Sequence, residues 1–399
     1  MVIIPSRMGR HNKRALLDRL LRLGTASRAG LAKSLGLSQP TAGKITDELI
    51  EMGAIEETGG ETQTGSDPAS PGPKMGRPGR MLRLIQSKSR FLGIQLGLAE
   101  TCLSPLPLSV PEEDRWLIKF NTPATAKEWS RKLQKAAAEI PQKSFWGILI
   151  SVPGLVDERK GKILYSPNLR WTAGTALSAA IREIWSAPVV LIQEERILAL
   201  GHHSAQPEGE DFLLVDFGEG VGSAVLIFGK LYAHPLPISG ELGHTPVMGN
   251  ERRCGCGSVG CLETLASIRG LLESFAGAHP KSRKTWEALS ESVAARGIEP
   301  WLAKTLDAMA AGIAGAMNIL GLRRVVITGS VTELPPSVFS FLSNAIVKGT
   351  LWARFGELKI EKAPRRRQAG LVAAGIDRLI VPDETTEPAH TQTLETTVK

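Results

Sequence analysis

The sequence predicts an α/β protein of two or three domains, in which a small helical N-terminal domain precedes a larger body. Two observations carry this prediction. From residue 91 onward, short runs of Val, Ile and Leu alternate with helical stretches, a pattern typical of covered β-sheets. Before that point, residues 11–57 show the apolar spacing of short amphipathic helices. These two sequence patterns predict a helical N-terminal head followed by an α/β body of roughly two halves.

The positive charge is concentrated in the head. Residues 1–90 carry 15 Lys and Arg against 8 Asp and Glu, so they hold +7 of the net charge of +8. This distribution favours nucleic-acid binding by the head, although a basic face can be merely solvated. The chain shows no apolar run of membrane-spanning length and no signal peptide, so we expect a cytoplasmic protein with reduced cysteines and no membrane partner.

Residues 11–57 predict a helix-turn-helix. The first helix, HNKRALLDRLLRLG, has one buried leucine stripe and ends at Gly24. Ser27 and Ser38 are the expected N-caps of a second and a third helix, which are joined by a tight turn containing glycine. A plain three-helix bundle without DNA contacts is the alternative.

The third helix is the expected recognition helix, because its N-terminal end would meet base edges. The residues predicted to contact DNA there are Ser38, Gln39, Thr41, Ala42 and Lys44. The residues predicted to form its inner face are Ile45, Leu49 and Met52.

Two short segments after this helix, AIEETGG and GRMLRLI, predict the strands of a wing. The intervening residues 59–80 are rich in Gly, Pro, Ser and Thr, as in a mobile wing tip or linker. Arg77 and Arg80 lie at the basic end of this segment. They are expected either to enter a DNA minor groove or only to screen phosphates.

A metal site is predicted by the segment ELGHTPVMGNERRCGCGSVGCLE, in which His244, Cys254, Cys256 and Cys261 are spaced H-x9-C-x-C-x4-C. Glycines between the cysteines allow the backbone to turn back, so that three thiolates can converge. One imidazole with three thiolates is a common tetrahedral zinc set and leaves no open position, which indicates a structural site. A disulfide or unrelated free thiols are the alternatives.

The body is predicted from five apolar strand segments and five helical segments. The strand segments are FLGIQLGL, WGILISV, PVVLI, DFLLVDFGEGVGSAVLI and RVVITGS. The helical segments are 124–140, 175–186, 194–204, 264–275 and 301–321. The tail from residue 382 is polar and is expected to be disordered.

With these segments identified, the chain resembles the ROK family, which groups sugar kinases with sugar-responsive repressors. The segments that carry the resemblance are SVPGLVD, SPNLRW, DFGEGVGSAVL, and ELGHTPV through GCLE. The resemblance implies a winged helix-turn-helix joined to a two-lobed body with the actin-like fold of sugar kinases and ribonuclease H. The implied ranges are 1–85 for the DNA-binding domain with its linker, 90–190 and 191–381 for the two lobes, the second with the zinc site, and 382–399 for the tail.

The resemblance to the kinases is broken at the residues that handle nucleotide. Gln95 stands where the first phosphate loop carries Asp, and Glu219 replaces the Thr of the second loop. Glu194 occupies the position of the catalytic base with a side chain one methylene longer, and catalytic geometry tolerates little displacement. We therefore expect no kinase activity and no catalytic residue.

The sugar-contacting positions that the resemblance implies are Asn168, Gln193, Glu194, Glu241, His244 and Glu263. Carboxylates and amides suit sugar hydroxyls because they can accept or donate in pairs. Zinc would fix the loop that aims Glu241 and Glu263. The alternative is a relic pocket, whose carboxylates make only structural hydrogen bonds.

The combined hypothesis is a transcriptional repressor of carbohydrate metabolism genes. A homodimer or homotetramer would bind a palindromic double-stranded DNA operator, and a sugar bound between the lobes would change the spacing of the heads. Structural Zn²⁺ would be its cofactor. The alternatives are an ATP-dependent sugar kinase that also binds DNA and a regulator controlled by a protein partner.

Overall fold

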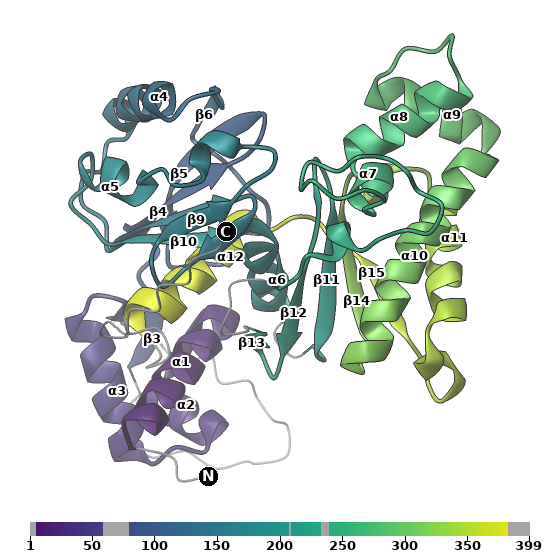
Figure 1. Cartoon of the computed structure of the whole chain (residues 1–399). Coiled ribbons are helices and arrows are strands. Elements are labelled where there is room, and N and C mark those ends of the chain that lie inside the picture. Colours follow the sequence, from purple (N-terminus) through teal and green to yellow (C-terminus); the bar gives the residue numbers. More distant parts are fainter. Residues whose placement is uncertain (1–4, 59–79, 207–208, 233–238, 382–399) are drawn as a thin grey trace, which may run out of the picture.

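The computed structural model describes residues 5–58, 80–206, 209–232 and 239–381 (Figure 1). Arg77, most of the 59–80 segment and the tail at 382–399 therefore lie outside the described residues. Within the described ranges, no helix combines the length and the apolar character needed to cross a bilayer.

The head is a winged helix-turn-helix, as the sequence predicts. Its elements are α1 (Pro5–Leu23), β1 (Thr25–Ser27), α2 (Arg28–Leu35), α3 (Gln39–Glu51), β2 (Ile55–Thr58) and β3 (Met81–Leu84). The three strands form an antiparallel sheet in the order β1-β3-β2. Both predicted caps are confirmed, because Ser27 Oγ accepts from Gly30 N at 3.0 Å and Ser38 Oγ accepts from Thr41 N at 3.3 Å. Met52, in contrast, follows α3 with 43% of its surface exposed, so its assignment to the inner face is wrong.

The first sheet of the body has the strand order β10-β7-β4-β5-β6. Its strands are β4 (Ser89–Leu96), β5 (Glu100–Pro107), β6 (Ile118–Asn121), β7 (Gly147–Val152) and β10 (Val189–Gln193). Helices α4 (Ala126–Glu139) and α5 (Leu177–Arg182) belong to this part, with the small hairpin of β8 (Leu155–Asp157) and β9 (Lys162–Tyr165). The carboxyl ends of β4, β7 and β10 are parallel neighbours, so the segments that follow them meet at one edge.

The second sheet has the order β13-β12-β11-β14-β15. Its strands are β11 (Phe212–Phe217), β12 (Val221–Ile227), β13 (Lys230–Leu231), β14 (Arg324–Gly329) and β15 (Lys359–Lys362). Its helices are α7 (Glu263–Ala266), α8 (Ile268–Ala278), α9 (Trp286–Arg296), α10 (Pro300–Leu320) and α11 (Pro336–Gly349). The single helix expected at 264–275 is interrupted at Ser267, whose hydroxyl caps α8 by accepting from Gly270 N.

Two helices lie between the sheets. Helix α6 (Glu194–Ala205) begins directly after β10, and α12 (Arg367–Gly375) follows β15 and packs along it (Figure 1). Their backbones come close, because a Cβ on Gly370 would lie 1.9 Å from Ile197 O. Helix α12 also packs on β4, β5 and β7, so the chain returns to the first sheet within the range 191–381 that the sequence assigns to the second lobe.

The head and the body share one hydrophobic core. Leu16, Leu17 and Leu20 of α1 are fully buried and belong to the same cluster as Leu371 and Val372 of α12. Burial of this kind is the main stabilising contribution to packing between elements. The head is therefore packed against the end of the α6–α12 pair.

Candidate functional site

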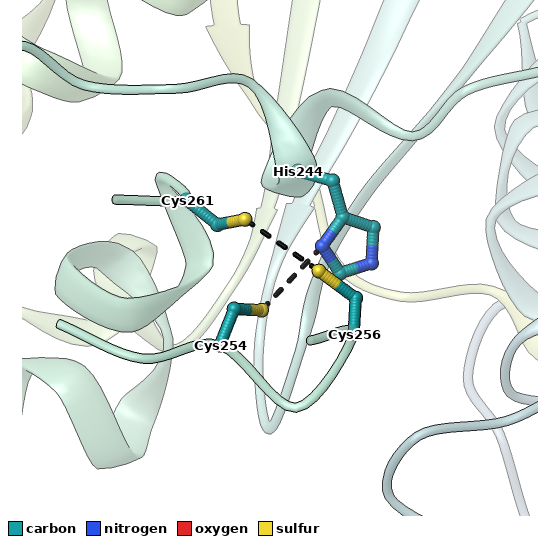
Figure 2. A group of neighbouring side chains, drawn as sticks. All are labelled: His244, Cys254, Cys256 and Cys261. Carbon is teal, nitrogen blue, oxygen red and sulfur yellow. Dashed lines mark hydrogen bonds between the residues drawn. The ribbon is translucent and has the colours of Figure 1, made fainter. Parts of the chain in front are cut away.

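The four predicted metal ligands come together in the loop before α7 (Figure 2). The donor atoms of His244, Cys254, Cys256 and Cys261 all lie within 4.8 Å of one another. Cys254 Sγ is 3.6 Å from His244 Nδ1, and Cys256 Sγ is 3.7 Å from Cys261 Sγ. All four cysteines of the chain are free, so the disulfide alternative is not supported.

These distances suit a tetrahedral metal site. With metal–sulfur bonds of about 2.3 Å and a metal–nitrogen bond of about 2.0 Å, tetrahedral geometry separates two sulfurs by roughly 3.8 Å and sulfur from nitrogen by roughly 3.6 Å. The observed separations of 3.7 Å and 3.6 Å match these values. The group could hold a metal ion, and its His-Cys₃ chemistry is compatible with zinc.

The metal loop adjoins one half of the predicted sugar positions. Gln193, at the end of β10, donates from Nε2 to Glu241 Oε1 at 3.2 Å. The other oxygen of Glu241 lies 3.7 Å from His244 Nε2, on the opposite side of the ring from the metal-facing Nδ1. Burial raises the pKa of Glu241, with the Glu263 carboxylate acting in the same direction and with His244 and Gln193 opposing it. Gln193, Glu241 and His244 thus form one connected group.

Glu263 and Asn168 approach the site from the other side. Glu263 is 6% exposed, and its Oε2 accepts from Val221 N at 3.1 Å. A Cβ on Gly220 would lie 3.0 Å from Glu263 Oε2 and 4.0 Å from Asn168 Nδ2, so both side chains border this glycine. Tyr165 donates to the carbonyl of Gly255 at 3.1 Å, which joins the first lobe to the metal loop. The metal loop therefore lies against the segment that carries Asn168.

Glu194 is held differently from the other predicted sugar positions. Arg367, the first residue of α12, donates from Nε to Glu194 Oε1 at 2.8 Å and places a terminal nitrogen 2.6 Å from the same oxygen. Both side chains are about 15% exposed. The Arg367 guanidinium therefore occupies this carboxylate oxygen. Glu194 is thus one half of a long-range ion pair with Arg367.

A second arginine, Arg365, fills the space between Gly218 and Gly329. Arg365 donates to both oxygens of Asp216 at 2.7 Å, and a Cβ on Gly218 or Gly329 would lie 2.2 or 2.9 Å from its guanidinium. Burial alone would raise the pKa of Asp216, but the Arg365 guanidinium outweighs burial and holds this pKa below its ordinary value. Glu219 lies exposed on the turn of the second loop.

Glu195 was not among the residues predicted to be functional. Its carboxyl group packs over Gly222, where a Cβ would lie 2.4 Å from Glu195 Oε1. Among the described residues, none donates to its buried Oε2. Burial, followed by the Glu194 carboxylate, raises the pKa of Glu195 to about 8. The signal available in the sequence was a charged residue directly after the base position.

The expected DNA-facing residues lie at the start of α3. Ser38, Gln39, Thr41 and Lys44 are exposed, and the Ser38 and Thr41 hydroxyls are 2.8 Å apart. Ala42 is fully buried, so the prediction that its side chain contacts DNA is wrong. It lies one residue after Thr41 on the helix and therefore points inward with Ile45. Arg80 is exposed and is paired with Glu57 at 2.5 Å.

Two of the three acidic residues of α3 are paired with basic residues of the head. Lys13 lies 2.7 Å from Glu48, and Arg28 lies 2.6 Å from Asp47. Each pair links α3 to another helix of the head. The carboxylates that would otherwise repel phosphate are thus compensated locally.

Comparison with known proteins agrees with this geometry. The ROK family profile matches residues 116–376. The xylose repressor of Caldicellulosiruptor bescii is 26% identical over 96% of this chain and 100% of its own length. The DNA-binding transcriptional dual regulator NagC of Escherichia coli is 26% identical over 84% of this chain and 86% of its own.

Solved structures share the fold. A ROK family transcriptional regulator, described as a homologue of the E. coli MLC protein, superimposes with a TM-score of 0.71 over 92% of this chain and 97% of its own, at 22% identity. A ROK family glucokinase from Streptomyces griseus superimposes with a TM-score of 0.57 over 71% of this chain and 97% of its own, at 22% identity. The profile covers more than half of the sequence, and the chain belongs to the ROK family.

Proposed function

We propose that this protein is a sugar-responsive, DNA-binding transcriptional repressor with a catalytically degenerate sugar-kinase-like body. The observation that carries the proposal is the joining of a winged helix-turn-helix to a body whose candidate sugar-contacting side chains converge beside a His-Cys₃ group. The near full-length similarity to the xylose repressor and to NagC supports it. The DNA would be a palindromic operator, and the protein would act as a homodimer or homotetramer.

The metal in this proposal is a structural Zn²⁺. Its ligands would be His244, Cys254, Cys256 and Cys261, whose separations suit zinc. When bound, the ion would neutralise the thiolates and fix the loop between Glu241 and Glu263. The side chains of these two residues, with Gln193, would then hold the sugar hydroxyls.

Loss of kinase activity is proposed from two ion pairs. Phosphoryl transfer needs a free base for the sugar hydroxyl and space for phosphates beside the glycine loops. Glu194 is paired with Arg367, and Arg365 fills the space beside Gly218 and Gly329. The expected result is no ADP release above background from ATP with D-xylose, N-acetylglucosamine or D-glucose. Sugar-dependent ADP release would favour the bifunctional kinase instead.

The DNA-binding assignment predicts the effect of replacing Thr41 and Lys44 with Ala. We expect operator affinity to fall by roughly 10- to 100-fold, because a base contact contributes about 1–3 kcal/mol and a phosphate contact less. The measurement is fluorescence anisotropy at fixed salt, on a duplex obtained by in vitro selection with the intact protein.

The matched control is Lys135→Ala on α4, which removes an exposed positive charge from the body rather than from the head. Operator affinity should then stay within about twofold of that of the unmodified protein. Unchanged affinity in the Thr41 and Lys44 double variant, with an unaltered circular dichroism spectrum, contradicts the placement of the recognition surface on α3.

The effector is tested by isothermal titration with D-xylose and N-acetylglucosamine, followed by operator binding in their presence. Binding of one sugar that lowers operator affinity supports the proposal. If neither these sugars nor a wider monosaccharide panel binds the folded protein, the candidate pocket is a relic. In that case the regulator controlled by a protein partner becomes the better explanation.

A further inference from the structure

Helix α12 has one end in the candidate sugar site and the other end against the head (Figure 1). At its first residue, Arg367 holds Glu194 as described above. The same end is fixed to the first lobe by Asp114, whose two oxygens accept from the backbone N–H groups of Arg367 and Gln368 at 3.1 and 2.9 Å. A carboxylate at a helix N-terminus is stabilising, because it satisfies free N–H groups and faces the positive end of the helix dipole.

The body of α12 is packed tightly enough to transmit a displacement. Its residues from Gln368 to Gly375 are all buried. The helix contacts α6 at two close backbone approaches, since a Cβ on Gly201 would lie 2.0 Å from Arg366 O and one on Gly370 would lie 1.9 Å from Ile197 O. Densely packed elements move as units rather than deform, so a shift at Glu194 would carry both helices.

The other end of α12 holds the head by a charged contact. Arg14 of α1 lies 2.9 Å from Asp377, in the turn directly after α12, and donates to the carbonyl of Ala373 at 3.4 Å. Arg14 Nε also donates to Asp18 Oδ2 at 3.0 Å, which fixes the guanidinium on its own helix. These groups are about a fifth to a third exposed, so the contact is partly shielded from solvent.

One part of the junction between head and body, beside the Arg14 contact, is not closely packed. A cavity of about 1170 Å³ lies between Leu21 of α1, Gln206 after α6, and Arg366 before α12. The head therefore contacts the body closely at the end of α12 and less closely at the neighbouring cavity. A rotation of α1 about the Arg14 contact would meet little packed material on this side.

From this arrangement we propose that Arg367 is a positioning residue of the sugar site, and that α12 transmits sugar binding at Glu194 to the DNA-binding head through Asp377 and Arg14. The inference rests on the proposed function. A sugar hydroxyl that bonds to Glu194 Oε1 competes with Arg367 for that oxygen. The resulting shift of Arg367 moves the N-terminus of α12, and the Arg14 contact then changes the orientation of α1. The sugar acts only through its different affinity for the two orientations.

The first test separates sugar binding from the response of the head, with Arg14→Gln in the full chain. D-xylose or N-acetylglucosamine, whichever binds the unmodified protein, should bind this variant with a Kd within about twofold of the original. The change in operator Kd caused by saturating sugar, typically about 5- to 150-fold in coupled systems, should fall below about twofold. Arg367→Gln should likewise reduce this change in operator Kd to below about twofold, because no guanidinium then links Glu194 to α12, and Arg367→Lys should restore part of the response.

The control is Arg90→Gln. Arg90 joins the body to the head by donating to the carbonyl of Gly53 and stacks on Trp146, and among the described residues it makes no hydrogen bond or ion pair with α12. This variant should keep the full operator response to sugar. A full response in Arg14→Gln would overturn the proposed route while leaving the sugar-responsive repressor intact, whereas absence of any sugar response in the unmodified protein would contradict the repressor itself.

A second measurement needs no sugar. Amide hydrogen exchange of α1 should become at least about threefold faster in Arg367→Gln than in the unmodified protein, because loss of the Glu194 contact loosens α12 at its far end. Among the described residues, Arg367 makes no hydrogen bond or ion pair with α1, so a purely local role would change exchange only near residues 108–117 and 194–198. Unchanged exchange in α1 would therefore overturn the proposal, whether or not a sugar has been identified.

Discussion

Replacing Cys256 with Ser is expected to remove the metal and to destabilise the second lobe. The remaining ligands would no longer be held together by the ion, and the loop has little apolar packing to replace it, since Met248 is 98% exposed and Val259 is 53% exposed. Structural zinc contributes directly to folding free energy, so the free energy of unfolding should fall by about 3–5 kcal/mol and the melting temperature by about 5–15 °C. Zinc content and thermal unfolding are the measurements.

Cys102→Ala is the matched control, because Cys102 lies on β5, outside the His-Cys₃ group, and is buried. This variant should retain one zinc per chain and lose only the stability of a small core truncation, about 1 kcal/mol. Full zinc content and an unchanged melting temperature in Cys256→Ser would contradict a structural His-Cys₃ site. In the proposed function, sugar affinity should fall together with zinc, because Glu241 and Glu263 flank the loop.

Replacing Glu195 with Gln is expected to stabilise the protein at high pH. Burial raises the pKa of Glu195 to about 8 in the folded state, above its ordinary value of 4.5. The folded protein therefore retains a proton that the unfolded chain releases between these values, and stability falls as pH rises from 4.5 to 8. Gln keeps the shape of the protonated side chain but cannot ionise. The free energy of unfolding of the variant should therefore exceed that of the unmodified protein by about 2–4 kcal/mol at pH 8 and should nearly match it at pH 4.5.

The measurement is urea unfolding at several pH values. Glu113→Gln is the control, since its side chain is 78% exposed. This substitution should change the free energy of unfolding by less than about 0.5 kcal/mol at every pH. A pH-independent difference between Glu195→Gln and the unmodified protein would show that this carboxyl group does not hold a proton in the folded state. A lower stability at pH 8 would instead indicate that the ionised carboxylate has a stabilising partner.

The local features of the chain were readable from the sequence because neighbouring residues produce them. The caps Ser27 and Ser38, the wing strands, and the buried strands of both sheets follow from short-range periodicity and hydrogen bonding. The metal ligands were equally accessible, since three of them lie within eight residues and glycines allow the loop to close. For these elements, the residues that determine the local structure lie within about one turn or one loop of each other in the chain.

The tertiary structure decided what each charged side chain does. Glu194 and Arg367 are far apart in sequence, as are Asp216 and Arg365, and Arg14 and Asp377. Their pairing depends on α12 returning between the two sheets, which no local pattern specifies. Ala42 and Met52 were misassigned for a related reason, because the depth of the core behind α3 is set by α1 and the wing. The sequence by itself thus determined the head, the sheets and the candidate metal ligands, whereas the long-range ion pairs of Glu194, Asp216 and Arg14 exist only after the chain has folded.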